Sequence, residues 1–363
     1  MAAKAAKTAK AAKGGFETRP RGPVGVGVIG LSIGRAHLHG YAKSPDARVL
    51  AVCDVNAQRA QAVAQEFGAP HAFADYREML KLDGLDAVSV CLPNYLHAPV
   101  TIACLRAGKH VIVEKPLALN AREGARMVQA AREGKRLLMT ALNNRFRGDV
   151  GVLKRFIEEG ELGRIYFAKT GWLRRRGCPR GWFGVKHLSG GGPLIDLGVH
   201  MLDLAWYLMG KPAPVRASGV TYSELGPGTG GYGVGWGQGE FDVEDLSVAL
   251  VRFADGQSIQ VEVSWASHIE CDRTFLDVLG TRGGAALEPQ LRIFTDQHGV
   301  QVDLLPGSPK VSGHEMEVIH FVNCILGRAE PIASGDDGLT VQHMLDAIYR
   351  SAKLGKEVAV GGE

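Results

Sequence analysis

The sequence predicts an α/β protein of two domains: a doubly wound parallel domain, then an α+β domain with a largely antiparallel, open-faced sheet. The chain of 363 residues is long enough to build two hydrophobic cores. Across residues 22–142, short apolar strands alternate with helices, which is typical of a parallel sheet covered on both faces. Across residues 143–363, several strands follow one another directly, as in an antiparallel sheet. We therefore place the domain boundary after residue 142 and treat residues 1–21 as a low-complexity Ala/Lys tail.

The elements of the first domain are marked by apolar runs and by signals at helix ends. Its expected strands are 24–29, 49–53, 87–91, 111–113 and 137–141, and its expected helices are 35–42, 57–67, 98–107 and 120–133. Gly68 and Gly108 follow two of these helices, where glycine commonly ends a helix. Asn120 and Glu123 have the spacing of a capping box at the start of the last helix.

The second domain is marked by longer strands and a hairpin signal. We expect a helix at 150–159, strands at 165–173, 246–253, 258–265 and 275–279, and C-terminal helices at 315–326 and 338–353. Residues 254–256, Ala-Asp-Gly, predict a hairpin turn between two of these strands. In the strand 258–265, apolar and polar residues alternate, which predicts one buried and one polar face. The glycine-rich stretch 226–239 is expected to be a surface loop.

Composition and charge exclude several classes of protein. The formal net charge is +4, and the four lysines in residues 1–15 account for it, because 42 basic residues minus four leave 38 against 38 acidic ones. A neutral body does not favour nucleic-acid binding, so we interpret the tail as a solubilising segment. No run of eighteen apolar residues occurs, and no membrane span is expected. The six scattered cysteines form no C-x-x-C pair, which predicts free thiols in a reducing cytoplasm.

A glycine turn between the first strand and the first helix predicts a phosphate loop. Residues 25–30 match G-x-G-x-x-G literally, but they lie inside the strand. The favoured register runs from Gly30 through Ser32 and Ile33 to Gly34, at the end of the strand. There the backbone can approach a pyrophosphate, and the helix N-terminus supplies N–H donors.

Asp54 is the second feature of the expected nucleotide site. It ends the second strand, 24 residues after Gly30, close to the spacing expected for the carboxylate that binds the adenosine ribose hydroxyls. A carboxylate at this place repels a 2′-phosphate, so we expect NAD rather than NADP. Arg59 is the opposing feature, because a nearby arginine can accommodate that phosphate.

Asp196 and His200 form a candidate site for proton transfer. They lie four residues apart, before an apolar run at 201–209 that is expected to be helical, so both should share one helix face. The ordinary pKa of histidine lies near neutral pH, and a carboxylate partner can fix its tautomer. The alternatives are a chance pairing on a helix, or a metal ion held together with one more histidine. The twelve histidines show no metal-ligand spacing, and no metal is expected.

Five segments together resemble the glucose–fructose oxidoreductase / inositol dehydrogenase / rhizopine catabolism family (Gfo/Idh/MocA). They are 30–37, Pro93-Asn94-Tyr95-Leu96-His97, Glu114-Lys115-Pro116, Asn144-Arg145-Phe146 and 191–200. The similarity covers residues 22–360 and is most specific in the E-K-P and D-x-x-x-H motifs. It departs at Ser32, where a central glycine is usual. The resemblance implies a Rossmann domain, an NAD cofactor, and a homodimer or homotetramer joined through the second sheet.

The resemblance also implies which residues hold the cofactor and the substrate. On the cofactor side these are Pro93, Asn94, His97, Glu114 and Lys115, and on the substrate side they are Arg145, Asp196 and His200. Trp182 is a further substrate-side candidate, because its aromatic ring could stack on a sugar face. For His97 a helix-capping role is an open alternative, and for Trp182 core packing is one.

The expected function is that of an NAD-dependent oxidoreductase acting on a secondary hydroxyl of a sugar or cyclic polyol. The resemblance implies that Lys115, Asp196 and His200 meet at the nicotinamide as the catalytic residues. Lys115 would hydrogen-bond the substrate hydroxyl, while His200 takes its proton and Asp196 orients the imidazole. Two alternatives stay open at this point: an NAD-dependent glycoside hydrolase that works by transient oxidation, and a non-catalytic NAD-binding sensor.

Overall fold

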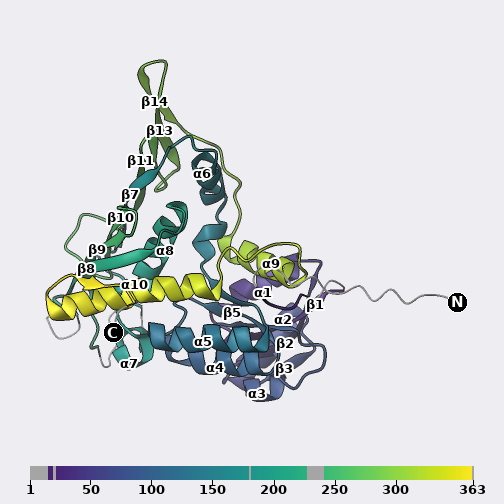
Figure 1. Cartoon of the computed structure of the whole chain (residues 1–363). Coiled ribbons are helices and arrows are strands. Elements are labelled where there is room, and N and C mark those ends of the chain that lie inside the picture. Colours follow the sequence, from purple (N-terminus) through teal and green to yellow (C-terminus); the bar gives the residue numbers. More distant parts are fainter. Residues whose placement is uncertain (1–14, 19–21, 180, 227–240, 362–363) are drawn as a thin grey trace.

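The computed structural model describes residues 15–18, 22–179, 181–226 and 241–361. The Ala/Lys stretch at residues 1–14 and all but the first residue of the glycine-rich loop predicted at 226–239 lie outside these ranges. Figure 1 shows a lower, helix-covered part and a sheet that rises above it to the hairpin β13–β14.

The first sheet has six strands, all parallel, in the order β3-β2-β1-β4-β5-β6. Its strands are β1 (Val24–Ile29), β2 (Ala47–Cys53), β3 (His71–Phe73), β4 (Ala87–Val90), β5 (His110–Glu114) and β6 (Leu138–Ala141). Its helices are α1 (Gly34–Lys43), α2 (Ala57–Phe67), α3 (Tyr76–Met79), α4 (Asn94–Arg106) and α5 (Ala121–Gly134). The predicted doubly wound sheet is confirmed, and its strand order reverses between β1 and β4, where ligands bind in such folds.

The second sheet has nine strands in the order β14-β13-β12-β11-β7-β10-β9-β8-β15. These are β7 (Ile165–Leu173), β8 (Pro214–Tyr222), β9 (Leu246–Phe253), β10 (Ser258–Ser264), β11 (Arg273–Gly280), β12 (Gly283–Ala286), β13 (Arg292–Gln297), β14 (Val300–Leu304) and β15 (Val358–Ala359). Neighbouring strands are antiparallel, as predicted, except that β10 pairs with β7 in parallel. Between β7 and β10 the chain passes through the helix α8 and then through β8 and β9, and the return strand β10 runs in the same direction as β7. The predicted hairpin turn joins β9 to β10.

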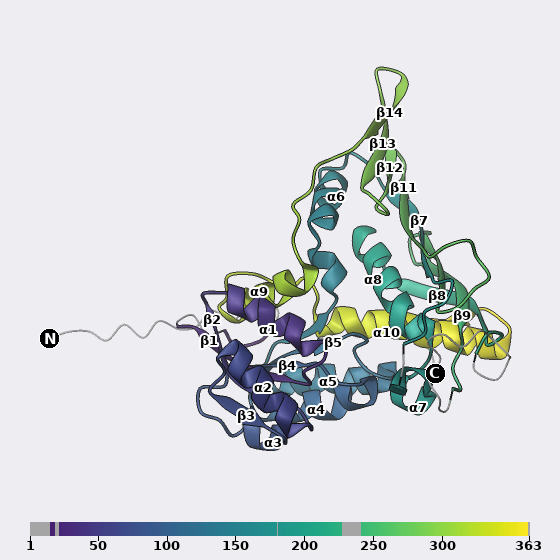
Figure 2. The same cartoon turned by 180° about the vertical axis from the view of Figure 1, so that it is seen from behind.

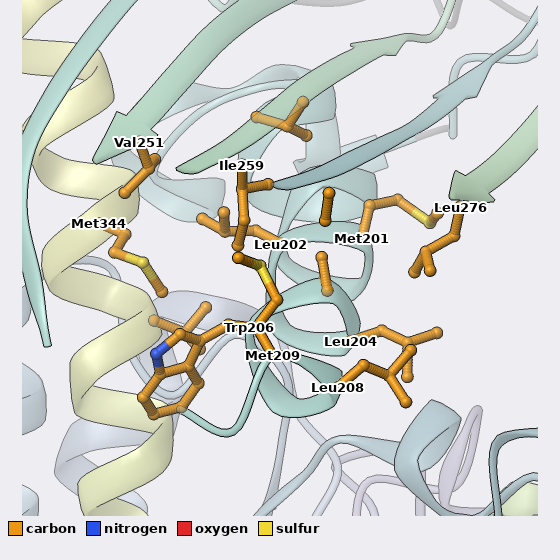
Figure 3. Packing of buried hydrophobic residues seen from close by; sticks show 14 of the residues in the cluster. Met201, Leu202, Leu204, Trp206, Leu208, Met209, Val251, Ile259, Leu276 and Met344 are labelled. Atoms are coloured by element: carbon orange, nitrogen blue, oxygen red, sulfur yellow. The ribbon is translucent and has the colours of Figure 1, made fainter. Parts of the chain in front are cut away.

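One face of the second sheet is covered by helices, and the other is open. Helix α8 (Val199–Leu208) and helix α10 (Gly335–Leu354) pack against the covered face. Figure 3 shows Trp206 of α8 and Met344 of α10 beneath Val251 and Ile259 of the sheet, inside one buried cluster. Burying apolar side chains of this size is the main force that holds the sheet and helices together. The predicted alternation in β10 is confirmed from 258 to 263, with the apolar residues buried and the polar side chains at 258, 260 and 262 on the other face. Ser264, which was predicted to lie on that polar face, is buried.

The C-terminal helices return to the first sheet. Helix α9 (Gly313–Ile325) packs on α1, and α10 also contacts α5 (Figures 1 and 2). A Cβ at Gly40 of α1 would lie 2.2 Å from a Val318 methyl of α9, so glycine is required for this close approach. The remaining elements are the helix α6 (Gly148–Glu158) and four short turns: η1 (Asn143–Phe146), η2 (Gly181–Gly184), α7 (Lys186–Ser189) and η3 (Leu194–Gly198).

Two further predictions concern the whole chain. The six cysteines are free thiols. Among the described residues, no helix is both long enough and apolar enough to cross a bilayer.

Candidate active site

A cavity of about 370 Å³ lies where the carboxyl ends of β4 and β5 face the covered side of the second sheet. It is lined by Ile33, Leu92, Asn94, Glu114, Lys115, Pro116, Asn143, Asn144, Trp172, Trp182, Phe183, Asp196, His200 and His314. Both sheets and helix α9 contribute to this lining. The cavity therefore lies at the strand ends where the topology predicts ligand binding.

Lys115 and Asp196 form the charged centre of the cavity. The Lys115 Nζ donates to Asp196 Oδ1 at 3.0 Å and to the Asp196 carbonyl at 3.2 Å. The second carboxylate oxygen of Asp196 accepts the indole N–H of Trp265 at 3.0 Å. Burial raises the pKa of Asp196, but the Lys115 charge and hydrogen bond, together with the indole, outweigh burial and lower it below its usual value. Asp196 is thus an ionised partner that holds the lysine in place.

His200 lies in the same cavity but does not bond to Asp196. Burial, followed by the positive charge of Lys115, lowers the pKa of His200 to about 3, against the opposing charge of Asp196. Its buried Nδ1 has no hydrogen-bond partner among the described residues. The expected Asp196–His200 hydrogen bond is absent because η3, which carries Asp196, is a π-helical turn, to which α-helical i, i+4 geometry does not apply. Asp196 and His200 line the same cavity, but Asp196 accepts a hydrogen bond from Lys115 instead of bonding to His200.

The loop before α1 fits a dinucleotide. Gly30 has φ +86°, and a Cβ there would lie 2.1 Å from the Cys91 carbonyl oxygen, so only glycine permits this turn. Gly34 lets α1 lie against β1, since its Cβ would approach Val28 to 2.8 Å. Ser32 and Ile33 are exposed, and α1 begins without a side-chain cap. An uncapped helix N-terminus behind a glycine turn can receive a pyrophosphate.

Asp54 lies at the end of β2, as predicted, and is nearly buried. Its Oδ2 accepts the Leu31 N–H at 3.2 Å, and its Oδ1 accepts the Asn56 N–H at 2.9 Å. Arg59 Nη1 donates to the same carboxylate at 3.2 Å. The Asp54 carboxylate is therefore fixed beside the phosphate loop. Arg59, the residue that could have favoured NADP, is hydrogen-bonded to this carboxylate.

Of the residues expected near the nicotinamide, Asn94, Glu114 and Lys115 line the cavity, and Pro93 is the N-cap of α4. His97 lies elsewhere. It is fully buried, and its two ring nitrogens lie 2.7 Å from the carbonyl oxygens of Leu92 and Pro116. These contacts join the loops that follow β4 and β5.

Arg145 and Trp182, both expected to contact substrate, have different places. Arg145 is buried outside the cavity lining, where its guanidinium pairs with Asp203 at 2.6 Å and Asp337 at 2.7 Å. Its donors are committed to this internal network, so the geometry does not support substrate binding. Trp182 does line the cavity, stacked on Phe183 with ring centroids 3.9 Å apart.

The comparisons with known proteins agree with this geometry. Residues 24–142 match the family model "Oxidoreductase family, NAD-binding Rossmann fold", and residues 150–286 match "GFO/IDH/MocA C-terminal domain". The chain is 33% identical over 345 residues to D-glucoside 3-dehydrogenase of Escherichia coli, across 93% of this chain and 97% of that protein. The chain belongs to the Gfo/Idh/MocA family of oxidoreductases.

Other members of the family are similar over most of their length. Myo-inositol 2-dehydrogenase of Thermotoga maritima is 30% identical over 273 residues, 75% of either chain. The solved structure of levoglucosan dehydrogenase in complex with NADH and levoglucosan superposes with a TM-score of 0.83 at 26% identity, covering 94% of this chain and all of that one. The predicted family, fold and NAD cofactor are confirmed, and the dehydrogenase interpretation is favoured over the hydrolase and sensor alternatives.

The lining residues that sequence reasoning missed include Trp172, Asn143 and His314. Trp172 lies on β7, and no motif marks it. Asn143 precedes a recognised segment, and its Nδ2 lies 3.2 Å from His314 Nδ1. His314 reaches the cavity only because α9 packs on α1, so no local pattern announces it.

Proposed function

We propose that this family member oxidises a secondary hydroxyl of a sugar or cyclic polyol, with NAD as the hydride acceptor. The observation that carries the proposal is the Lys115–Asp196 ion pair of 3.0 Å, in one cavity with the neutral imidazole of His200. The aromatic rings of Trp172, Trp182 and Phe183 line the same cavity and suit the apolar face of a sugar ring. The relatives named above act, by their names, on a glucoside, an inositol and levoglucosan.

The side chains have separate tasks in this proposal. Lys115 donates a hydrogen bond to the substrate hydroxyl and stabilises the negative charge that develops on its oxygen. Asp196 keeps the lysine aimed, and Trp265 keeps Asp196 in place through the indole N–H. His200, which is unprotonated, accepts the hydroxyl proton, and the negative charge of Asp196 favours the imidazolium that forms. The bound nicotinamide supplies the hydride acceptor.

The cofactor preference follows from Asp54. Because this carboxylate is fixed beside the phosphate loop and engages Arg59, a 2′-phosphate would meet a negative charge and no free guanidinium there. We therefore propose that NAD binds at least about tenfold more tightly than NADP, a difference of about 1.4 kcal/mol.

Two further features support proposals about where and how the protein acts. The free thiols support a location in a reducing compartment such as the cytoplasm. The open face of the second sheet supports a homodimer or homotetramer.

A substrate screen tests the proposal. Nicotinamide absorbance would be followed with a panel of polyols, aldoses and glycosides, for the native chain and for Lys115→Ala. We expect reduction of NAD with at least one sugar or polyol, and a fall in turnover by a factor on the order of 100 in the variant, which still binds NAD. Near-normal turnover of Lys115→Ala would refute the site. Glycoside cleavage without net NAD reduction would instead identify the hydrolase.

A further inference from the structure

A buried hydrogen-bonded chain lies behind the cavity and ends at Lys115. On α1, His37 is fully buried, with Nε2 3.1 Å from Glu114 Oε1 and Nδ1 3.0 Å from Ser89 Oγ. The hydroxyl of Tyr41 lies 2.8 Å from the same Ser89 oxygen. The other oxygen of Glu114 accepts the backbone N–H of Lys115 at 3.1 Å. His37 therefore orients the carboxylate that holds the backbone of the lysine.

Glu317 of α9 lies beside this chain and has no hydrogen bond. Its side chain is fully buried, neither carboxyl oxygen has a partner among the described residues, and Oε1 lies 3.8 Å from His37 Nε2. Burial, and then the negative charge of Glu114, raises the pKa of Glu317 well above its usual value. Two buried carboxyls with one imidazole between them are best accommodated when Glu317 is a neutral acid and Glu114 carries the single charge.

Glu114 is held in its charged form by its neighbours. Burial opposes ionisation of Glu114. The hydrogen bond from His37, the electrostatic attraction of His37 and the charge of Lys115 outweigh burial, and they lower the pKa of Glu114 to about 2. The titratable groups that face the pair are His37 and Tyr41 of α1, Cys91 after β4, Lys115 after β5, and His314 of α9. Among the described residues, the His37 imidazole is the one titratable side chain of this set that is hydrogen-bonded to the Glu114 carboxylate.

We propose that His37 is a positioning residue, whose hydrogen bond keeps Glu114 ionised and directed toward the cavity where the nicotinamide binds. Glu317 is the protonated member of this buried pair of carboxyl groups. Glu114 lines the cavity beside Lys115, so its charge faces the region where the nicotinamide binds. The oxidised nicotinamide is a cation and the reduced one is neutral. A fixed negative charge in a water-poor site therefore favours NAD⁺ over NADH, and His37 sets that preference through Glu114. The inference rests on the proposed function in that the nicotinamide binds in this cavity beside Lys115.

The test measures cofactor binding instead of turnover. Dissociation constants for NAD⁺ and NADH would be measured from about pH 6 to about pH 8 with the full chain, alongside the melting temperature of each variant. In the native protein the ratio of the two constants should be flat over this range, because Glu114 stays ionised. In His37→Leu, Glu114 loses its donor and takes up a proton as the pH falls. NAD⁺ binding should then weaken relative to NADH by about tenfold toward pH 6.

Two matched variants separate positioning from damage to the core. His37→Gln places an amide N–H where Nε2 lies and should restore a flat ratio. Ser89→Ala removes the other hydrogen bond of His37 but leaves the Glu114 contact, so its ratio should also stay flat. A flat ratio in folded His37→Leu, or an equal pH-dependent shift in Ser89→Ala, would overturn the proposal.

Glu317→Gln tests where the proton lies. Because glutamine imitates a neutral acid, the variant should keep the native NAD⁺/NADH ratio within about twofold near pH 7. A larger shift would mean that Glu317 is charged in the native protein. A stoichiometric divalent metal in the purified native chain, lost in Glu317→Gln, would also overturn the proposal, because the cluster would then be an ion site. Binding constants do not depend on turnover, so this inference and the substrate assignment fail separately.

Discussion

At the scale of single residues, the environment of His200 decides how the site responds to pH. Its pKa is lowered to about 3 by burial and by Lys115, so the imidazole is unprotonated at pH 5 and above. A base with so low a pKa adds no acidic limb, and we predict that alcohol oxidation loses no rate to His200 protonation between about pH 5 and pH 8. The pH dependence of kcat/KM would check this. A limb near pH 6.5 that disappears in His200→Asn would contradict it.

Asp196 and Lys115 should behave as one unit. Asp196→Asn removes the charge that holds the lysine and should lower kcat about 100-fold, the scale of losing one electrostatic group. Trp265→Phe removes only the indole N–H to Asp196 and should cost less, roughly tenfold. Added to Lys115→Ala, Asp196→Asn should cause little further loss. A double-mutant cycle on kcat gives the measurement, and losses that multiply would show that the two groups act independently.

Asp54 offers a residue-scale test of cofactor choice. Asp54→Ala removes the negative charge and frees Arg59, which now donates to it at 3.2 Å. We expect the NAD/NADP affinity ratio to fall by about tenfold or more, since charge repulsion is replaced by a guanidinium. Titration of both cofactors measures the ratio. In the control Asp54→Ala/Arg59→Ala the gain in NADP binding should vanish, and its persistence would mean that another group binds the phosphate.

At the scale of elements, periodicity explains what the sequence could predict. Strands β1, β7 and β9 and helix α2 occur at the predicted residues, because continuous or alternating apolar runs end at clear turns. Strand β8 was missed because its inward-facing residues Ala217, Gly219 and Thr221 are small or polar, so they form no apolar pattern. Strand β3 and helix α3 are too short, at three and four residues, to show a period.

The same reasoning explains the site. Lys115 and Asp54 directly follow apolar strands, so local sequence places them at the ligand-binding edge. His314 and Glu317 depend on the packing of α9 against α1, which no short pattern encodes. The ion pairs of Arg145 could not be predicted, because its motif is local whereas its partners Asp203 and Asp337 come from distant helices.

The junction of β5 and β6 should make the fold sensitive to acid. His110 on β5 accepts the Leu137 N–H at Nδ1, and burial, followed by the charge of Arg136, lowers its pKa to about 4. The unfolded chain binds a proton at His110 near pH 6.5, whereas the folded chain does not. The contribution of His110 to the free energy of unfolding is therefore present above that pH and is lost as the pH falls. At pH 5 the loss is about 2 kcal/mol.

His110→Asn provides the matched control for this effect. An asparagine oxygen can accept the same N–H but does not titrate. Urea denaturation at about pH 5 and about pH 7 should therefore show a smaller loss of unfolding free energy in the variant, by about 2 kcal/mol. Equal losses in both proteins would show that His110 is protonated in the folded chain.

At the scale of the whole molecule, the site exists because two cores meet. The first sheet supplies Glu114 and Lys115, the second part supplies Asp196 and His200, and α9 and α10 bridge back to the first sheet. Each part alone would carry only some of the catalytic residues.

The strand register shows which residues lie on the open face of the second sheet. Val220 of β8 lies beside Val248 of β9, and Val248 lies beside Glu262 of β10.

This open face should be the contact between subunits. It is polar along β10, but β8 adds Val220 and Tyr222 and β11 adds Leu279, and these side chains are between 37% and 46% exposed. An apolar surface of this kind on a sheet without covering helices favours association with a second copy. We predict a dimer or tetramer by light scattering at micromolar concentration, and dissociation in Val220→Asp. The control Val300→Asp changes an equally apolar side chain, 61% exposed on β14, and should leave the assembly intact. A monomeric native protein, or dissociation in Val300→Asp alone, would show that the contact is not made through this face.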